Sequence, residues 1–186
     1  MNKLNPFIGD LSIVIKQCLL LLREQDSAMP KRELYAVNAI LHHEMVSLEC
    51  TKFKVWWRNC PRDEAGPEPL EHLLTVPLLL LKYVKKAEKD YKMKLKRLLG
   101  PKADTKFSFP QPSADIRRKA EKNGEYWPTA DDTVAKIYHE FHTKEKHAFW
   151  LVKFFRKPKR VLVRRSVMEY FFPINSLTFI HKTQRR

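Results

Sequence analysis

The sequence predicts a mainly α-helical protein, made of a helical hairpin, two further amphipathic helices, an extended basic arm and a C-terminal tail. Three observations lead to this prediction. Apolar residues recur at spacings of three and four in four stretches, prolines mark the edges of those stretches, and only 4 of the 186 residues are glycine. The expected segments are a neutral hairpin over 1–60, a proline-rich loop over 61–76, a basic helix over 77–99, a connecting arm over 100–128, an amphipathic helix over 129–156 and a C-terminal extension over 157–186.

The N-terminal hairpin is predicted from two amphipathic patterns. Asp10 is suited to cap a first helix over 10–24. Pro30 suits the first turn of a second helix that continues toward Trp57. The apolar side of this second helix would be Leu34, Val37, Leu41, Met45 and Leu48. It must end before the segment 61–69, because three prolines and a glycine there favour a loop.

The stretch 77–99 predicts a long basic helix that ends at Gly100 and Pro101. Its apolar positions are Leu80, Val84, Ala87, Tyr91, Leu95 and Leu98. Its cations are Lys82, Lys85, Lys86, Lys89, Lys92, Lys94, Lys96 and Arg97. A helix of this length spans about 33 Å, comparable with one turn of a nucleic-acid duplex. Because only Glu88 and Asp90 oppose these cations, we expect an anionic partner rather than an ordinary solvated face.

The arm over 100–128 is expected to be irregular, apart from a short helix over 113–122 that ends at Asn123 and Gly124. Its aromatic residues are Phe107, Phe109, Tyr126 and Trp127. We expect these rings to pack back onto the helices, because no aromatic-rich sheet motif surrounds them. Anchoring on a partner or stacking on an unpaired base is the alternative.

The fourth helix is predicted over 129–156, opened by a capping box from Thr129 to Asp132. Its apolar stripe would be Val134, Ile137, Tyr138, Phe141, Ala148, Phe149 and Val152. It should end at the Lys157-Pro158 step, since the residue before a proline disfavours helix. The basic segment 156–165 is then expected to be extended against phosphates, or to act as a nuclear-localisation-like signal, and the tail 167–186 to be an apolar strand or hook docked on protein, with a basic end.

Charge divides the chain into two parts. The whole sequence has 36 Lys and Arg against 21 Asp and Glu, a formal net charge of +15. Residues 1–76 are close to neutral, whereas the remaining 110 residues carry the entire excess. Such an excess predicts an anionic partner but says nothing about the fold. The front part is therefore expected to pack on protein, and the rear part on an anion.

The motifs of common enzymes and metal sites are absent from the sequence. Three cysteines without a CxxC pair predict neither a disulfide framework nor a zinc site. His139 and His142 could share a helix face, with Glu140 and Glu145 nearby, but a fourth ligand is not in evidence and Lys144 and Lys146 oppose a metal. There is no phosphate-binding glycine loop and no nucleophile motif. We therefore expect no catalytic activity, cofactor, metal or small-molecule substrate, and no apolar run is long enough for a transmembrane segment.

Small, basic, glycine-poor chains with extended arms resemble in style the ribosomal proteins, especially the lineage-specific ones of mitochondrial ribosomes. The sequence therefore predicts a structural ribonucleoprotein subunit of the mitochondrial matrix, which binds rRNA backbone and neighbouring ribosomal proteins. Two alternatives stay open: an accessory subunit of an inner-membrane respiratory or ATP synthase complex, and a free nucleic-acid-binding regulator. The residues predicted to bind RNA are Lys82, Lys85, Lys86, Lys89, Lys92, Lys96, Arg97, Arg156, Lys157, Lys159, Arg160, Arg164 and Arg165.

Overall fold

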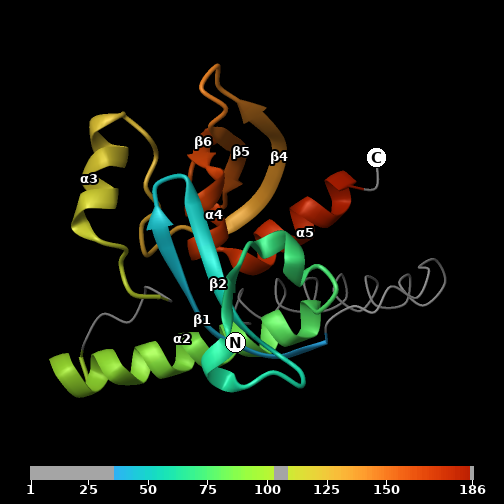
Figure 1. The fold of residues 1–186 in the computed structure, drawn as a ribbon. Coiled ribbons are helices and arrows are strands. Elements are labelled where there is room, and N and C mark those ends of the chain that lie inside the picture. The colour runs from blue at the N-terminus through green and yellow to red at the C-terminus, as the bar shows by residue number, and fades with distance from the viewer. Residues whose placement is uncertain (1–35, 103–108, 185–186) are drawn as a thin grey trace, which may run out of the picture.

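The computed structural model describes residues 36–102 and 109–184, and these residues form two three-stranded antiparallel sheets and four α-helices (Figure 1). The mainly helical fold that periodicity predicts is therefore wrong. Two of the stretches expected to be helical are β-hairpins, each continued into a three-stranded sheet. The expected first helix over 10–24 and the ring of Phe107 lie outside the described residues.

The first sheet replaces the second helix of the predicted hairpin. Its strands, in spatial order, are β1 (Val37–Ser47), β2 (Cys50–Trp57) and β3 (Gly66–Glu68). Along β2 the side chains of Thr51, Phe53 and Val55 are buried, and they alternate with the lysines at 52 and 54. Alternation with a period of two is the pattern of a half-buried strand. The alternation covers only the short strand β2, whereas the preceding residues have a longer pattern that favours a helix.

The apolar pattern of strand β1 resembles that of a helix because the pairing of β1 with β2 is irregular. The register shifts at three places, between Val37 and Ala39, between Ile40 and His42, and between Met45 and Ser47. Each bulge adds a residue and turns the following side chains toward the other face of the sheet. The buried apolar residues of β1 and its turn are consequently Val37, Ile40, Met45 and Leu48. Those spacings resemble the three-four rhythm of an amphipathic helix.

The second sheet replaces the helix predicted over 129–156. Its strands, in spatial order, are β4 (Val134–His142), β5 (Ala148–Phe154) and β6 (Val161–Arg164). Trp150, Val152 and Phe154 are fully buried and alternate along β5, while β4 again contains register shifts. The Asp132 carboxylate accepts hydrogen bonds from the Thr129 N–H at 2.7 Å and from the Tyr126 hydroxyl at 2.5 Å. Half of a capping box thus forms, but it closes a turn that leads into a strand.

The helices agree better with the sequence. Helix α2 (Pro77–Leu99) confirms the basic helix, and Gly100 ends it with a φ of 89°, a conformation that favours glycine. Helix α3 (Ala114–Lys122) confirms the short helix of the arm, with Ser113 as its N-cap. The expected apolar strand or hook after residue 166 is wrong. The chain forms α4 (Arg165–Phe171) and α5 (Pro173–Gln184), while single 3-10 turns, η1 (Arg62–Glu64) and η2 (Leu70–Leu73), flank β3.

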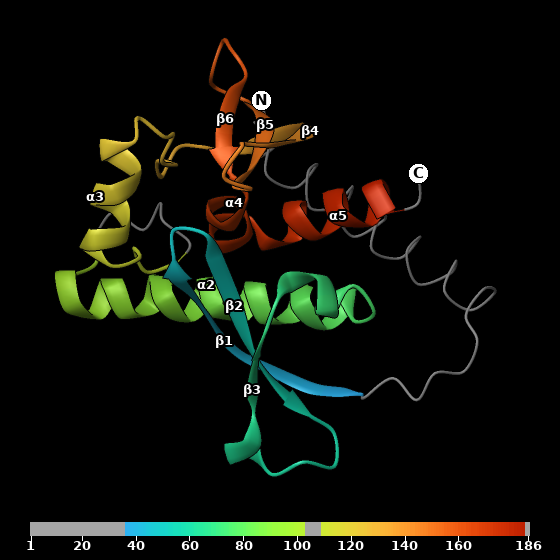
Figure 2. The same ribbon diagram turned by 45° about the horizontal axis from the view of Figure 1, so that its top comes forward.

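Helices α4 and α5 form a layer that joins the two sheets. Helix α4 contacts β1 and β2 on one side and β5 and β6 on the other. Figures 1 and 2 show α4 and α5 between the sheet β4–β6 and helix α2. The fully buried side chains come from every layer and form one core. The largest of them are Trp150, Phe53, Phe154, Leu70, Leu73, Leu80, Met168 and Leu177.

The aromatic residues of the arm that lie in the described chain pack back onto this core, as expected. Phe109 is buried, the Tyr126 ring lies 5.6 Å from that of Phe154, and the Trp127 ring lies 5.7 Å from that of Phe171. Aromatic side chains bury large areas and so contribute strongly to a small core. The arm is thereby fixed along the outside of the two sheets rather than extended from them.

His43 of β1 joins four parts of the fold at one point. Its Nε2–H donates to the backbone carbonyl of Tyr170 at 3.1 Å, so its Nδ1 accepts the hydroxyl hydrogen of Tyr83 at 2.7 Å. Its ring also stacks on Phe53 at 5.2 Å and meets the edge of Phe109 at 4.6 Å. Burial lowers the pKa of His43 to about 4. The imidazole is therefore neutral at physiological pH and acts as a structural link.

Candidate nucleic-acid interface

Helix α2 has two unlike halves. Its first two turns pack on the core through Pro77, Leu80, Leu81 and Val84, all of which are buried. From residue 85 to its end the helix has no buried residue, and Leu98 and Leu99 are each 69% exposed. Figure 1 shows this half extending past both sheets. The apolar positions predicted near the C-terminal end are therefore not part of the core, and tertiary packing does not explain why this half is so long.

The projecting half of α2 carries a continuous stripe of lysines. Lys85, Lys89, Lys92 and Lys96 follow one another at spacings of four, three and four, which places them on one side of the helix. The remaining cations, Lys86, Lys94 and Arg97, follow on the neighbouring side. Among residues 36–102 and 109–184, none of these seven cations forms an ion pair with a carboxylate. Glu88 lies among the stripe lysines, so repulsion between lysines one turn apart is only partly offset within the described fold.

The second predicted basic segment splits into an exposed part and a buried part. Arg156, Lys157, Lys159 and Arg160 occupy the loop between β5 and β6, and all except Lys157 are exposed. Arg156 lies 3.8 Å from the exposed carboxylate of Asp131, a weak surface pair. Figures 1 and 2 place β5 and β6 across the α4–α5 layer from α2. The structure therefore does not bring the two basic segments into one surface.

Arg164 lies inside the fold, at the end of β6. Its Nε is 2.7 Å from Oε2 of Glu125, and its Nη2 makes a second contact with the same carboxylate. The side chains of Arg164 and Glu125 are only 5% and 8% exposed. Burial by itself would raise the pKa of Glu125, but the Arg164 guanidinium outweighs burial and lowers it. Arg164 thus holds the arm against the second sheet.

Arg165 starts helix α4 and is surrounded by three carboxylates. Its Nε lies 2.7 Å from Oε1 of Glu169, and its Nη1 lies 3.4 Å from Oε1 of Glu140. Glu71 of η2 forms a third ion pair with it. Burial raises the pKa of Glu169 although the Arg165 charge acts in the opposite direction. Arg164 and Arg165 both have carboxylate partners inside the fold, so they do not belong to the exposed basic surface that could bind RNA.

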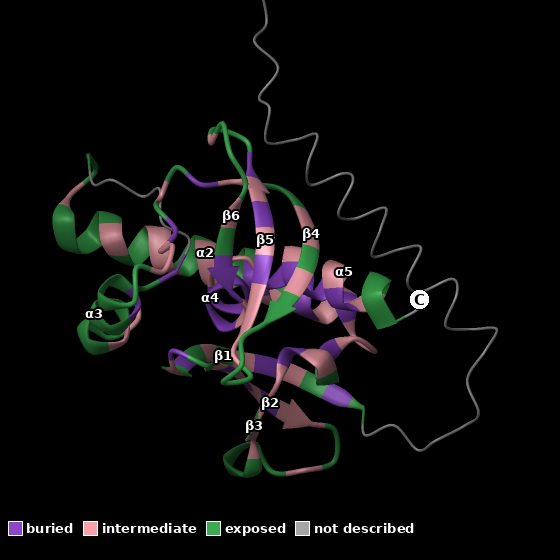
Figure 3. Cartoon of the chain, turned by 90° about the horizontal axis from the view of Figure 1, so that it is seen from above, coloured by how far each residue is buried: buried purple, intermediate pink, exposed green. Residues whose placement is uncertain are grey.

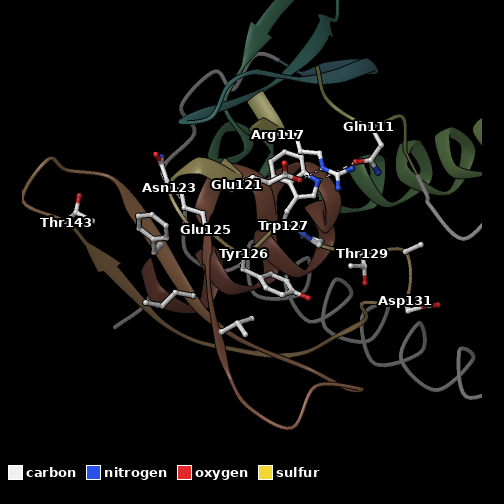
Figure 4. Close-up of a pocket in the computed structure, with 16 residues that line it drawn as sticks. Gln111, Arg117, Glu121, Asn123, Glu125, Tyr126, Trp127, Thr129, Asp131 and Thr143 are labelled. Atoms are coloured by element: carbon white, nitrogen blue, oxygen red, sulfur yellow. Dashed lines mark hydrogen bonds and ion pairs between the residues drawn. The ribbon is translucent and has the colours of Figure 1, made fainter. Parts of the chain in front are cut away.

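A cleft of about 1200 Å³ opens between helix α3, the segment 123–131 and the strands β5 and β6 (Figure 4). Arg117 pairs with Glu121 at 2.7 Å, and the Trp127 indole N–H donates to Gln111 at 3.4 Å. Glu125 already binds Arg164. The charged groups of this cleft thus largely form ion pairs. They are not arranged as a nucleophile next to a base that a third group orients.

The two histidines predicted as possible metal ligands, His139 and His142, both lie on strand β4, not on a helix. His139 meets the edge of the Phe141 ring at 6.4 Å, while His142 lies 3.8 Å from Glu140. Successive strand residues point to opposite faces, so a shared helix face does not exist. In the part of the chain that the structure describes, no three His, Cys, Asp or Glu side chains are grouped as a metal ion would require.

Comparison with known proteins gives no family for this chain. No protein-family model matches it, and no curated protein matches it either. The membrane question has a structural answer for the described residues: none of their helices combines the length and the apolar character needed to cross a bilayer. Charge and exposure, above all the unpaired lysine stripe of α2, are therefore the observations from which a function can be inferred.

Proposed function

We propose that this protein is a structural subunit of a ribonucleoprotein and that the projecting half of α2 binds the phosphate backbone of RNA. The observation that carries the proposal is the lysine stripe from Lys85 to Lys96, exposed on a helix half that has no buried residue. A helix that packed only on protein would bury an apolar face along its length. A rigid row of unpaired cations matches instead a row of phosphates.

The mechanism is electrostatic and does not read sequence. Each lysine that reaches a phosphate releases condensed counterions, which favours binding and makes it strongly dependent on salt. Lysine presents a compact point charge without the bidentate geometry of arginine, which suits backbone contact rather than base recognition. The folded body would then contact neighbouring proteins, with α2 as the element that reaches the RNA.

The test is the salt dependence of RNA binding by the full chain. Lys85→Gln, Lys89→Gln and Lys96→Gln together remove three exposed charges and keep good helix formers. We expect the slope of log K against log salt, measured by fluorescence anisotropy on an RNA duplex, to fall by about 2 to 3. Affinity at physiological salt should fall roughly 10- to 100-fold by the same principle.

The matched control removes three exposed lysines elsewhere, by Lys119→Gln, Lys122→Gln and Lys144→Gln. If α2 is the interface, this control keeps the wild-type slope, although its net charge is the same as that of the α2 variant. Equal losses in both variants would show that net charge alone attracts RNA, and would overturn the proposal. Stronger dependence on α2 for vesicles of anionic lipid than for RNA would favour the membrane-associated alternative.

The cellular assembly is a second and separate part of the proposal, in which we place the protein in the mitochondrial matrix and on its ribosome. Affinity purification of the tagged full chain, with and without ribonuclease, tests it. We expect the protein to sediment with a ribosomal particle, and this association to be lost after ribonuclease treatment. Comigration with a detergent-solubilised respiratory complex, unaffected by ribonuclease, would overturn this part.

A further inference from the structure

The second sheet has one face on the core and an opposite face that is largely unburied; at Phe149 and Leu162 this opposite face also lines the cleft beside α3. Trp150, Val152 and Phe154 of β5 point into the core. The strand pairing places the intervening side chains on the opposite face, because directly paired residues share a face. In Figure 3 the strands β4–β6 lie in front of α4 and α5, with this face toward the viewer. We call its unburied part the open face; its residues are Lys136, Tyr138, Phe141, Phe149, Leu151, Lys153, Arg160 and Leu162. At one end of the same face the buried Arg164 pairs with Phe149, and its guanidinium carbon lies 4.8 Å from the centre of that ring.

The open face is apolar and aromatic over β4, β5 and β6, although it faces solvent in the described fold. None of its eight residues is buried, and Phe141 and Leu162 are 47% and 50% exposed. Phe141 pairs with Phe149, and Leu151 pairs with Leu162. An antiparallel sheet with one solvated face normally alternates apolar and polar side chains, with the polar ones outside. An uncovered apolar field of this kind marks a binding surface.

One end of the open face carries a row of cations. Lys136 and Lys153 are directly opposite on neighbouring strands. The Lys153 ammonium donates to the backbone carbonyls of Lys157 and Pro158, whereas Lys136 is exposed. Arg160 adds a third cation, with its guanidinium carbon 4.1 Å from the centre of the Tyr138 ring. The Lys136 ammonium lies 4.9 Å from the same ring. Both cations thus lie over the Tyr138 ring, beside the apolar field.

The acidic groups near this face do not neutralise the row. Asp131 pairs with Arg156 on the neighbouring loop, at 3.8 Å. Glu140 belongs to the core side of β4, where it meets Arg165 at 3.4 Å. Glu125 is bound to Arg164 at the far end of β6. Among the described residues, the open face therefore combines two exposed cations, Lys136 and Arg160, with the exposed ring of Phe141.

We propose that the open face binds single-stranded nucleic acid, with a base against Phe141 and phosphates at Lys136 and Arg160. A single strand offers both unpaired bases and a row of phosphates, so it satisfies both features of the face. A duplex would not fit, because its bases are stacked on one another and closed to side chains. An apolar protein partner would leave Lys136 and Arg160 unpaired, which disfavours that occupant.

This site is separate from the RNA-binding surface proposed on α2. It lies on the other side of the α4–α5 layer and recognises unpaired nucleotides, whereas α2 recognises a charged backbone. The two can therefore fail independently. A chain with both surfaces would hold a duplex and an adjoining single strand at the same time.

The experiment compares binding of oligouridylate and of an RNA duplex to the full chain, by fluorescence anisotropy. Phe141→Ala removes an exposed ring and is expected to weaken oligouridylate binding roughly 5- to 100-fold. Lys136→Gln with Arg160→Gln should weaken it and reduce its salt dependence by about 1 to 2. Duplex binding should stay unchanged in these variants. The Lys85, Lys89 and Lys96 variant should show the reverse pattern.

Two control variants test whether the loss of oligouridylate binding is specific to the open face. Val46→Ala removes an exposed apolar side chain from the first sheet, and Lys119→Gln with Lys122→Gln removes two exposed charges from α3. Both should bind oligouridylate as the wild type does. Circular dichroism and thermal unfolding establish that each variant is folded. Ultraviolet crosslinking of oligouridylate, followed by mass spectrometry, should locate the modified residue on β4.

Three results would overturn the inference. The wild type could fail to bind oligouridylate while it binds the duplex, which would leave the α2 proposal intact. Phe141→Ala could bind oligouridylate as tightly as the wild type. The wild type could instead be a dimer that Phe141→Ala converts to a monomer and that oligouridylate does not displace, which would assign the face to a second copy of the chain.

Discussion

Each lysine of the α2 stripe carries the same charge as Arg164 or Arg165, the two arginines where β6 meets α4. The two groups differ in their exposure and in their carboxylate partners. Lys85, Lys89 and Lys96 are exposed and have no carboxylate partner in the described chain. Arg164 and Arg165 are enclosed, and between them they pair with Glu49, Glu71, Glu125, Glu140 and Glu169. The difference teaches that a positive residue serves folding or binding according to its burial and its partners. Density of positive charge along the chain does not distinguish the two.

Removal of Arg164 should have the largest effect on stability. Arg164→Met leaves the Glu125 carboxylate buried without its cation, and breaking a buried pair in this way costs about 3 to 5 kcal/mol. We expect urea unfolding, monitored by circular dichroism, to show a loss of that size. A loss below about 1 kcal/mol would mean that the pair is solvated, and the contrast between the two groups of cations would no longer hold.

The matched control for this variant is Arg156→Met, eight residues earlier in the same basic segment. Arg156 is 77% exposed and its pair with Asp131 is long, at 3.8 Å. The same substitution there should change the free energy of unfolding by less than about 0.5 kcal/mol. A double variant, Arg164→Met with Glu125→Leu, should recover much of the lost stability, because it replaces a buried pair with apolar groups.

Acid should weaken the fold, and His43 gives one reason. Its pKa is lowered to about 4 in the fold, from 6.5 in an unfolded chain. Below pH 6.5, His43 therefore binds a proton in the unfolded state but not in the folded state. Stability is complete above about pH 7 and falls progressively toward pH 4, by up to about 3 kcal/mol.

The pH range of this loss distinguishes the contribution of His43 to stability from that of the buried Glu125 carboxylate. The pKa of Glu125 is lowered, so its contribution is present above the ordinary carboxyl pKa and is lost only at more acidic pH. In His43→Gln the decline between pH 6.5 and 4.5 should flatten, and the acid limb below it should remain. An unchanged profile in the variant would show that His43 is solvated and titrates normally.

The parts of the fold that local signals determine could be predicted from the sequence. Helix α2 begins at Pro77 and ends at Gly100, and both residues act on the backbone directly. Strands β1 and β4 could not be predicted, because their bulges depend on pairing with a neighbouring strand and distort the alternation. Strand β5 could have been recognised from Trp150, Val152 and Phe154, had a period of two been weighed against a period of 3.6.

The candidate surfaces divide in the same way. The lysines of α2 were found because a regular helix converts sequence spacing directly into a surface stripe. The burial of Arg164 could not be predicted, because its partner Glu125 is 39 residues away and reaches it only through the path of the arm. The open face needs the register of three strands, since Lys136, Lys153 and Arg160 come together only across the sheet.

The smallest expected effect on stability belongs to the lysine stripe. Lys85→Gln, Lys89→Gln and Lys96→Gln relieve repulsion one turn apart on α2 and should raise the free energy of unfolding by a few tenths of a kcal/mol, about 0.2 to 0.5. Urea unfolding at low salt measures this gain. It should disappear at high salt, because salt screens charges that are exposed to solvent.

The direction of that change is more informative than its size. In this variant stability rises while the affinity for duplex RNA falls, whereas in Arg164→Met stability falls because a buried carboxylate loses its partner. A surface that serves folding would not gain stability when its charges are removed, so a gain would show that the stripe does not serve folding, and the loss of affinity would show what it serves. If the lysine variant instead lost about 1 kcal/mol or more, the stripe would have partners within the chain, and its cations would belong with Arg164 and Arg165.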